Sequence, residues 1–196
     1  MRNFFVLTAL STIATTAASG GLVSLSLQNG DGGAGPFNTT AFTLTNLSDA
    51  GVSLVTWSLT VGDTQYLYDF VYLDREQFVG GDATQTATLE IGDRTDDNVG
   101  PDLFRYGFTN FGAGIAFRGQ WDIDNDNGDF NADARLVMFN NGGLPNAQAV
   151  FNFSDGSVAA FTFPDAAIQD VYTYTIPEPS TLVALALLAV ALPRRR

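Results

Sequence analysis

The sequence contains no Cys, no His and no Lys, and all nine of its basic residues are Arg. Without Cys the chain can form neither a disulfide nor a thiol nucleophile. Without His or Lys it lacks the base of a serine triad, the amine of Schiff-base chemistry and the lysine of a phosphate-binding loop. A zinc site would also be unusual without His or Cys. One catalytic design survives, a carboxylate pair that cleaves glycosidic bonds, although no spacing marks two acids as partners.

Positive charge is scarce in the region between the two ends. Residues 21–176 hold five arginines against twenty acidic side chains, a formal charge of −15. A surface of this kind repels phosphate backbones and anionic lipid headgroups. The composition therefore excludes nucleic acid as a partner and makes divalent cations the natural small ligands.

The N-terminus reads as a secretory signal over residues 1–20. Arg2 supplies a positive start, residues 4–13 form a mostly apolar run, and small residues follow from Ala14. Cleavage points lie within residues 16–19, and this order of charge, apolar run and small residues is typical of an export signal. The apolar run is weak, which leaves a buried N-terminal helix or strand as the alternative.

The C-terminus combines three elements over residues 177–196. These are the triplet Pro177, Glu178 and Pro179, an apolar run over residues 182–192, and the arginines Arg194, Arg195 and Arg196. Eleven apolar residues form a helix of about 16 Å, well short of a hydrocarbon core of about 30 Å. We therefore expect a short hydrophobic helix that anchors the chain transiently in the inner membrane, with the arginines on the cytoplasmic side.

This tail resembles the PEP-CTERM sorting signal. The resemblance implies that an exosortase in the inner membrane cuts near the triplet and passes the protein to the cell surface or the exopolysaccharide matrix. It implies, as partners, the exosortase and the export machinery. The resemblance covers about twenty residues, and it carries no information about what residues 21–176 do.

Residues 21–176 are long enough for one domain with a sizeable core. Apolar residues alternate with polar ones in several segments, and Gly-, Asn- and Asp-rich stretches separate these segments. The pattern predicts an all-β fold, an antiparallel β-sandwich or jelly roll. Residues 147–163 form the clearest hairpin, with its turn at Asp155-Gly156, and a change of apolar phase predicts a bulge or strand break near Leu54-Val55.

An acidic run over residues 122–133 is the most pointed candidate site. Asp122, Asp124, Asp126 and Asp133 stand at positions one, three, five and twelve of a calcium-loop numbering. The match to an EF-hand loop is imperfect, because Gly128 falls at position seven and position twelve is not Glu. The alternatives are a Ca²⁺ site on a β scaffold and a solvated acidic turn. A second acidic loop over residues 93–102 reads as a solvated turn that could complete a shared site if it folds beside the first.

Aromatic residues offer a weaker hypothesis of sugar binding. Tyr66, Tyr68, Phe70 and Tyr72 would share one face of a strand, where rings could stack on sugars. Burial of this strand on both sides is the favoured interpretation. Trp121 borders the acidic run and is better placed than Trp57 for ligand contact, although a structural role is favoured for it as well.

The sequence thus predicts an exported, non-enzymatic protein of the cell surface or exopolysaccharide matrix. The first alternative is a calcium-dependent carbohydrate-binding module that uses the acidic run. The second is a small glycosidase with a carboxylate pair. Glu76 and Glu90 are the only glutamates of residues 21–176, which are called the body below.

Overall fold

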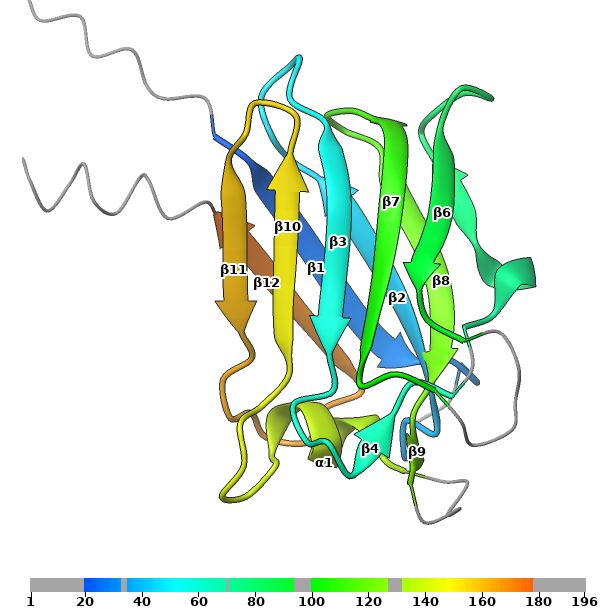
Figure 1. Cartoon of the computed structure of the whole chain (residues 1–196), viewed down its shortest axis with the longest axis vertical. Helices are drawn as coiled ribbons and strands as arrows, with labels where there is room; N and C mark the ends of the chain where they lie inside the picture. Colours follow the sequence, from blue (N-terminus) through cyan, green and yellow to red (C-terminus); the bar gives the residue numbers. More distant parts are fainter. Residues whose placement is uncertain (1–19, 33–34, 70, 94–99, 127–131, 178–196) are drawn as a thin grey trace, which may run out of the picture.

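The chain folds as two antiparallel five-stranded sheets packed face to face (Figure 1). The computed structural model describes residues 20–32, 35–69, 71–93, 100–126 and 132–177. The first sheet has the order β12 (Val171–Pro177), β1 (Leu22–Asn29), β2 (Thr39–Asn46), β8 (Ala116–Asp122) and β5 (Gln77–Val79). The second has the order β11 (Val158–Thr162), β10 (Gln148–Phe153), β3 (Leu54–Thr60), β7 (Leu103–Phe111) and β6 (Thr86–Ile91). The prediction of an all-β antiparallel fold is confirmed.

Alternation of side chains along the strands directs one face of each sheet inward. In β1 and β2 every second residue is buried, because successive side chains of a strand point to opposite faces of its sheet. The predicted irregularity is a bulge in β3, where the register against β7 shifts between Leu54 and Thr56. The predicted hairpin is formed by β10 and β11, and Gly156 in its turn adopts a φ of 87° that favours glycine.

The core between the sheets is dominated by aromatic rings. Trp57 from β3 meets Phe42 from β2 edge to face, with ring centroids 4.9 Å apart. Phe42 also stacks on Trp121 from β8 at 5.0 Å. Because these rings come from both sheets, their contacts fix how the two layers pack.

Short elements close one end of the sandwich. They are β4 (Tyr66–Leu67), which pairs with β9 (Asp124–Asn125), and α1 (Ala134–Phe139). The 3₁₀ helix η1 (Leu73–Arg75) instead lies against β8 at the side of the sandwich (Figure 1). The sequence pattern did not predict α1, because six residues are too few for a helical period to become visible. Within the described parts of the chain, no helix is long and apolar enough to span a bilayer.

Both ends of the described chain lie side by side. Leu22 at the start of β1 pairs with Pro177 at the end of β12. This pair lies at the end of the sandwich opposite α1, β4 and β9 (Figure 1). The predicted export signal, apart from Gly20, and the sorting signal after Pro177 fall outside the described residues.

Candidate functional site at the acidic end

The end of the sandwich that carries α1, β4 and β9 is called the acidic end, because described residues of both predicted acidic loops lie there. The backbone N–H of Val71 donates to the carbonyl of Asp93 at 2.9 Å, and that of Val61 donates to the carbonyl of Asp102 at 2.9 Å. The N–H of Asp126 donates to the carbonyl of Gln65 at 3.0 Å. One connecting segment, residues 61–71, thus contacts both acidic loops and holds them at the same end.

Three of the predicted calcium ligands occupy different environments. Asp122 is half-buried at the end of β8, and its Oδ1 accepts a hydrogen bond from the N–H of Ile123 at 2.9 Å. Asp124 lies in β9 opposite Leu67 and is only 1% exposed, whereas Asp126 follows β9 and is exposed. The run is therefore not one extended strand that presents alternate carboxylates to a common point.

Asp133, the fourth predicted ligand, is the N-cap of α1. Its Oδ1 accepts hydrogen bonds from the backbone N–H groups of Phe37 at 3.2 Å and Arg135 at 3.1 Å. Its Oδ2 lies 2.8 Å from Nη2 of Arg135, whose side chain is nearly buried. Burial alone would raise the pKa of Asp133, but the hydrogen bonds from Arg135 and Phe37 outweigh it and lower this pKa. The capping and pairing contacts already use both oxygens of this carboxylate.

The structure brings together two acids that the sequence places in separate loops. Asp102 is exposed, but the part of its side chain that packs against protein loses contact with water, which raises its pKa above the usual value of 3.8. The negative charge of Asp126 raises this pKa further. Asp102 belongs to the second acidic loop and Asp126 to the first. Asp126 therefore lies near enough for its charge to act on Asp102, but among the residues with defined placement no group of three or more acidic side chains is arranged to hold a metal ion.

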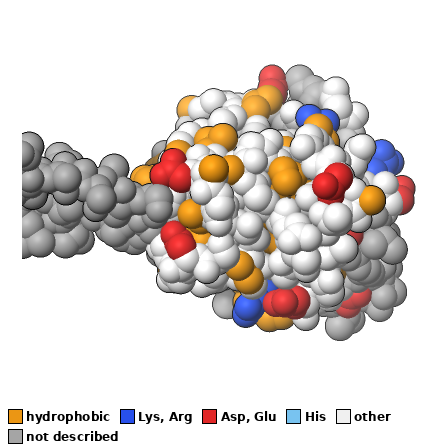
Figure 2. Space-filling model, turned by 90° about the horizontal axis from the view of Figure 1, so that it is seen from above, with side chains coloured by type: hydrophobic (Ala, Val, Ile, Leu, Met, Phe, Trp, Pro, Cys, Tyr) orange, Lys and Arg blue, Asp and Glu red, His pale blue; other side chains and the backbone are white. Residues whose placement is uncertain are grey.

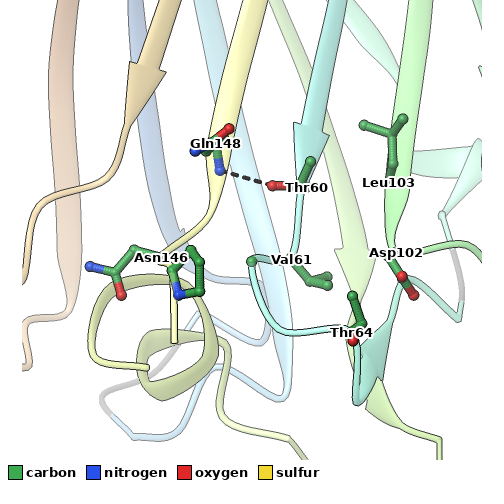
Figure 3. Close-up of a pocket in the computed structure, with 9 residues that line it drawn as sticks. Thr60, Val61, Thr64, Asp102, Leu103, Asn146 and Gln148 are labelled. Atoms are coloured by element: carbon green, nitrogen blue, oxygen red, sulfur yellow. Dashed lines mark hydrogen bonds between the residues drawn. The ribbon is translucent and has the colours of Figure 1, made fainter. Parts of the chain in front are cut away.

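Asp102 also borders a pocket of about 370 Å³ between the loops of the acidic end. In Figure 3, Asp102 and Thr64 lie on one side of this pocket and Asn146 on the other. The backbone N–H of Gln148 donates to Oγ1 of Thr60 at 3.0 Å and ties β10 to β3 beside it. Gly62 has a φ of 88°, and a Cβ there would come within 2.5 Å of the carbonyl oxygen of Pro145. The pocket therefore depends on a glycine that allows two loops to touch.

The aromatic candidates with defined placement are buried or half-buried, which indicates a structural role. Trp121 is 0% exposed and packs among core rings, so no sugar can reach it. Tyr68 is likewise buried, which raises its pKa well above the usual value, while Tyr66 and Tyr72 are half-buried. Among the described residues of the expected aromatic strand, residues 66–67 form a strand and Val71 forms an isolated bridge with Trp121, whereas Phe70 lies outside the described part.

No convergent metal cluster occurs in the described parts of the acidic end. Among the residues with defined placement, no group of three or more acidic side chains is arranged to hold a metal ion. Asp129, within the same run, falls in the segment 127–131, which lies outside the described residues. Of the predicted sorting residues, Pro177 is the last residue of β12, whereas Glu178, Pro179 and the three terminal arginines lie outside the described part.

Comparison with known proteins gives no relative from which a role could be carried over. No family model matches the chain, and no curated protein or solved structure matches it.

Proposed function

We propose that this chain is an exported, non-enzymatic protein of the cell surface or exopolysaccharide matrix, delivered by a secretory signal and released through an exosortase-type system. Its partners are the export machinery, the exosortase and extracellular polysaccharide. The inner membrane holds it only transiently, through the C-terminal apolar run.

The observation that carries this proposal is where the described strands begin and end relative to the two predicted terminal signals. The first strand starts at Leu22, two residues after the predicted signal, and the last strand ends at Pro177, the first residue of the triplet. Every described strand lies between these two residues. Removal of both terminal segments would leave all of these strands in place, which is what a protein processed at both ends requires.

The position of the two ends also suits attachment to a membrane. Four residues lie between Pro177 and Leu182, and the five steps of extended chain that join the two reach at most about 18 Å. Before cleavage the body would thus stay close to the bilayer, with its chain ends toward the lipid and the acidic end away from it (Figure 1). This orientation keeps the acidic loops clear of anionic headgroups.

The end that would face the lipid shows no continuous hydrophobic patch. Figure 2, which views the molecule from the top of Figure 1, shows scattered hydrophobic side chains among polar side chains and backbone, with several acidic side chains between them. Isolated exposed side chains such as Leu47 and Val158 are ordinary surface features rather than an insertion site. The body is therefore held near the bilayer by the C-terminal run and not by this face.

The glutamates of the body support a non-enzymatic role. Glu76 accepts a hydrogen bond from the hydroxyl of the core residue Tyr106 at 2.5 Å. Glu90 forms an ion pair with Arg105, with Oε2 and Nε 2.8 Å apart. Both carboxylates have structural partners, whereas a glycosidase needs a protonated acid facing a second carboxylate across a sugar.

Processing can be tested in a bacterium that contains an exosortase. We expect the wild-type chain to lose its C-terminal segment and to reach the surface or the medium. A variant with Pro177, Glu178 and Pro179 replaced by Ala should keep the segment and remain in the inner-membrane fraction. Cell fractionation and the intact mass of the product are the measurements.

A matched control uses the residues next to the triplet. Ser180→Ala with Thr181→Ala alters the same region without touching the triplet and should be processed like the wild type. Equal processing of the triplet variant, or retention of the wild-type chain in the cytoplasm, would contradict the proposal.

The approach of Asp102 to Asp126 beside a pocket favours a second candidate, calcium-dependent carbohydrate binding at the acidic end. A Ca²⁺ ion takes six to eight oxygen ligands, and carboxylates, carbonyls and waters all qualify. The second acidic loop would then complete the site with Asp102, in place of Asp133, which caps α1.

Thermal unfolding of residues 20–177 with millimolar Ca²⁺ and with EDTA tests this candidate. An ion present at a hundred times its dissociation constant adds about 2.7 kcal/mol to the free energy of unfolding, a rise of roughly 5–10 °C in Tm. We expect Asp102→Asn to abolish such a rise. An unchanged Tm in the wild-type protein would leave both loops as solvated turns.

A further inference from the structure

The outer face of the first sheet carries a polar groove of about 400 Å³, which we call the arginine groove. It lies on β1, β2 and β8, away from the acidic end's pocket. Its lining includes two of the five arginines of the body. The side chains that matter for its chemistry are Gln28, Thr43, Arg75, Arg118 and Gln120.

The sheet register explains why the groove exists. Ala41 of β2 lies between Gln28 of β1 and Gln120 of β8 in one row across the sheet. In the next row, Thr43 lies beside Arg118. A small side chain between two long amides leaves a notch in the surface, and the arginine borders that notch.

Gln120 is the buried part of the groove. It is 8% exposed, and its side-chain amide has no hydrogen bond to any residue with defined placement. Gly30 makes room for this amide, because a Cβ at that position would collide with Nε2 of Gln120. A largely buried side chain whose amide lines a cavity and has no partner among the described residues is suited to a ligand with hydroxyl or carboxylate groups.

The arginines are available to an anionic ligand. Arg118 is exposed, and its strand neighbours Thr43 and Gln77 are neutral. No carboxylate of the described residues forms an ion pair with Arg118, although the body has four acidic side chains for every arginine. Arg75 lies 3.6 Å from Asp74, but both side chains are well exposed, so this pair is weak and easily exchanged.

We propose that the arginine groove binds a carboxylate-bearing sugar unit of an extracellular polysaccharide. The planar guanidinium of Arg118 matches a carboxylate in two-point geometry, and Arg75 adds a second positive charge. The amides of Gln28 and Gln120 and the hydroxyl of Thr43 match sugar hydroxyls. This inference rests on the proposed function and names the chemistry of the polysaccharide partner.

Charge limits which polysaccharide can bind. A body with a formal charge of −15 repels a polymer that is charged at every sugar. Along the five strands of this sheet, however, Asp122 is the only acid among the outward-facing residues. The groove therefore suits a mostly neutral polysaccharide in which acidic sugars are spaced apart.

A nuclear magnetic resonance titration of ¹⁵N-labelled residues 20–177 tests the groove directly. The probes are glucuronate and galacturonate, with glucose and galactose as neutral counterparts, all in EDTA so that no cation can bridge a sugar to the acidic end. We expect the acidic sugars to shift the side-chain amide signals of Gln28 and Gln120 and the Nε–H signal of Arg118. The neutral sugars should shift them far less.

Two variants test whether the acidic sugars bind at the arginine groove. Arg118→Gln should weaken binding of the acidic sugars at least tenfold, since a charged hydrogen-bonded contact is worth roughly 1.5–3 kcal/mol. Arg105→Gln, on the outer face of the second sheet, removes the same charge and should leave the affinity unchanged. Because Arg118 is exposed, its variant should remain folded, and the dispersed amide spectrum checks this.

The inference would be overturned by equal shifts with glucose, by equal loss with Arg105→Gln, or by no shift at the groove with either acid. A groove that responds as strongly to inorganic sulfate as to the acidic sugars would be a simple anion site, which also contradicts it. None of these results bears on export. Correct processing of the triplet with no sugar binding would remove this inference and leave the proposed function standing.

Discussion

Asp133 illustrates at the scale of one residue how a candidate ligand can instead be a structural group. Its carboxylate caps α1, holds the N–H of Phe37 and pairs with Arg135, which is 7% exposed. An isolated sequence cannot reveal these contacts, because Phe37 lies 96 residues away. Asp is favoured both as a Ca²⁺ ligand and as the N-cap of a helix. The spacing that suggested a calcium site is therefore equally consistent with a helix cap.

We expect Asp133→Ala to lower the free energy of unfolding by about 3 kcal/mol, because it removes the cap and leaves the buried charge of Arg135 unpaired. Asp133→Asn should cost less, since the amide oxygen can still cap the helix. Urea denaturation of the two variants measures the difference. Equal stability of Asp133→Ala and the wild type would show that the cap and ion pair contribute little.

At the scale of elements, regular strands were predictable and the closing segments were not. The hairpin of β10 and β11 and the bulge in β3 follow from local alternation, turn residues and a change of phase. By contrast, Tyr66 to Tyr72 alternates like a long strand, yet its described residues form only the two-residue strand Tyr66–Leu67, paired with β9, and an isolated bridge between Val71 and Trp121. Tertiary contacts with two distant loops override the local pattern there.

The candidate sites were likewise predictable from the sequence only in part. The sequence identified the acidic run and the second acidic loop, but the approach of Asp102 to Asp126 depends on how β4 pairs with β9. The arginine groove left no signal in the sequence, because Gln28, Arg118 and Gln120 become neighbours only through the register of three strands. Spacing along the chain carries no information about such cross-strand rows.

β12 links the fold to the proposed processing. It is an edge strand paired with β1, and Ile176, next to the triplet, is buried in the core. We expect Ile176→Ala to cost about 3 kcal/mol of stability through the cavity that it leaves. Thr175→Ala, on the exposed face of the same strand, should change stability by less than about 0.5 kcal/mol. Thermal unfolding of residues 20–177 measures both.

The burial of Ile176 also limits where the chain can be cleaved near the triplet. Cleavage before Ile176 would remove a core side chain and the last pairs between β12 and β1. The intact mass of the mature protein should therefore place its C-terminus at Pro177 or later. A product that ends before Ile176 and stays folded would contradict the role of β12 described here.

At the scale of the whole molecule, the charge distribution determines how stability depends on pH. The chain has no His and no Cys, the side chains that commonly titrate between about pH 5 and 8. Local hydrogen bonds lower the pKa of Asp82 and Asp155, and Asp133 is lowered by its hydrogen bonds despite burial. Asp102 shifts the other way, because burial and Asp126 raise its pKa.

The sign of each contribution follows from linkage between proton binding and folding. Groups with a lowered pKa stabilise the folded state above the unfolded value of 3.8, and this stabilisation is lost as pH falls through their folded pKa. Asp102 acts oppositely, because its ionised form is disfavoured in the folded state. Asp102→Asn should therefore raise stability slightly at pH 7 in EDTA, by no more than about 0.5 kcal/mol, since the side chain is exposed and screened.

We expect the free energy of unfolding to fall below pH 3.8 in 0.5 M NaCl, where screening suppresses the general repulsion among the acidic side chains. At low salt, relief of that repulsion should first raise stability as pH falls from 7 toward 4, because the body loses negative charge. Urea denaturation across this range, at both salt concentrations, measures the two effects. Asp133→Asn should flatten the fall below pH 3.8, since it removes a carboxylate that is held by an ion pair and by two backbone N–H groups. If stability in high salt keeps rising as pH falls below 3.8, repulsion dominates and the local contacts of Asp133 do not control acid stability.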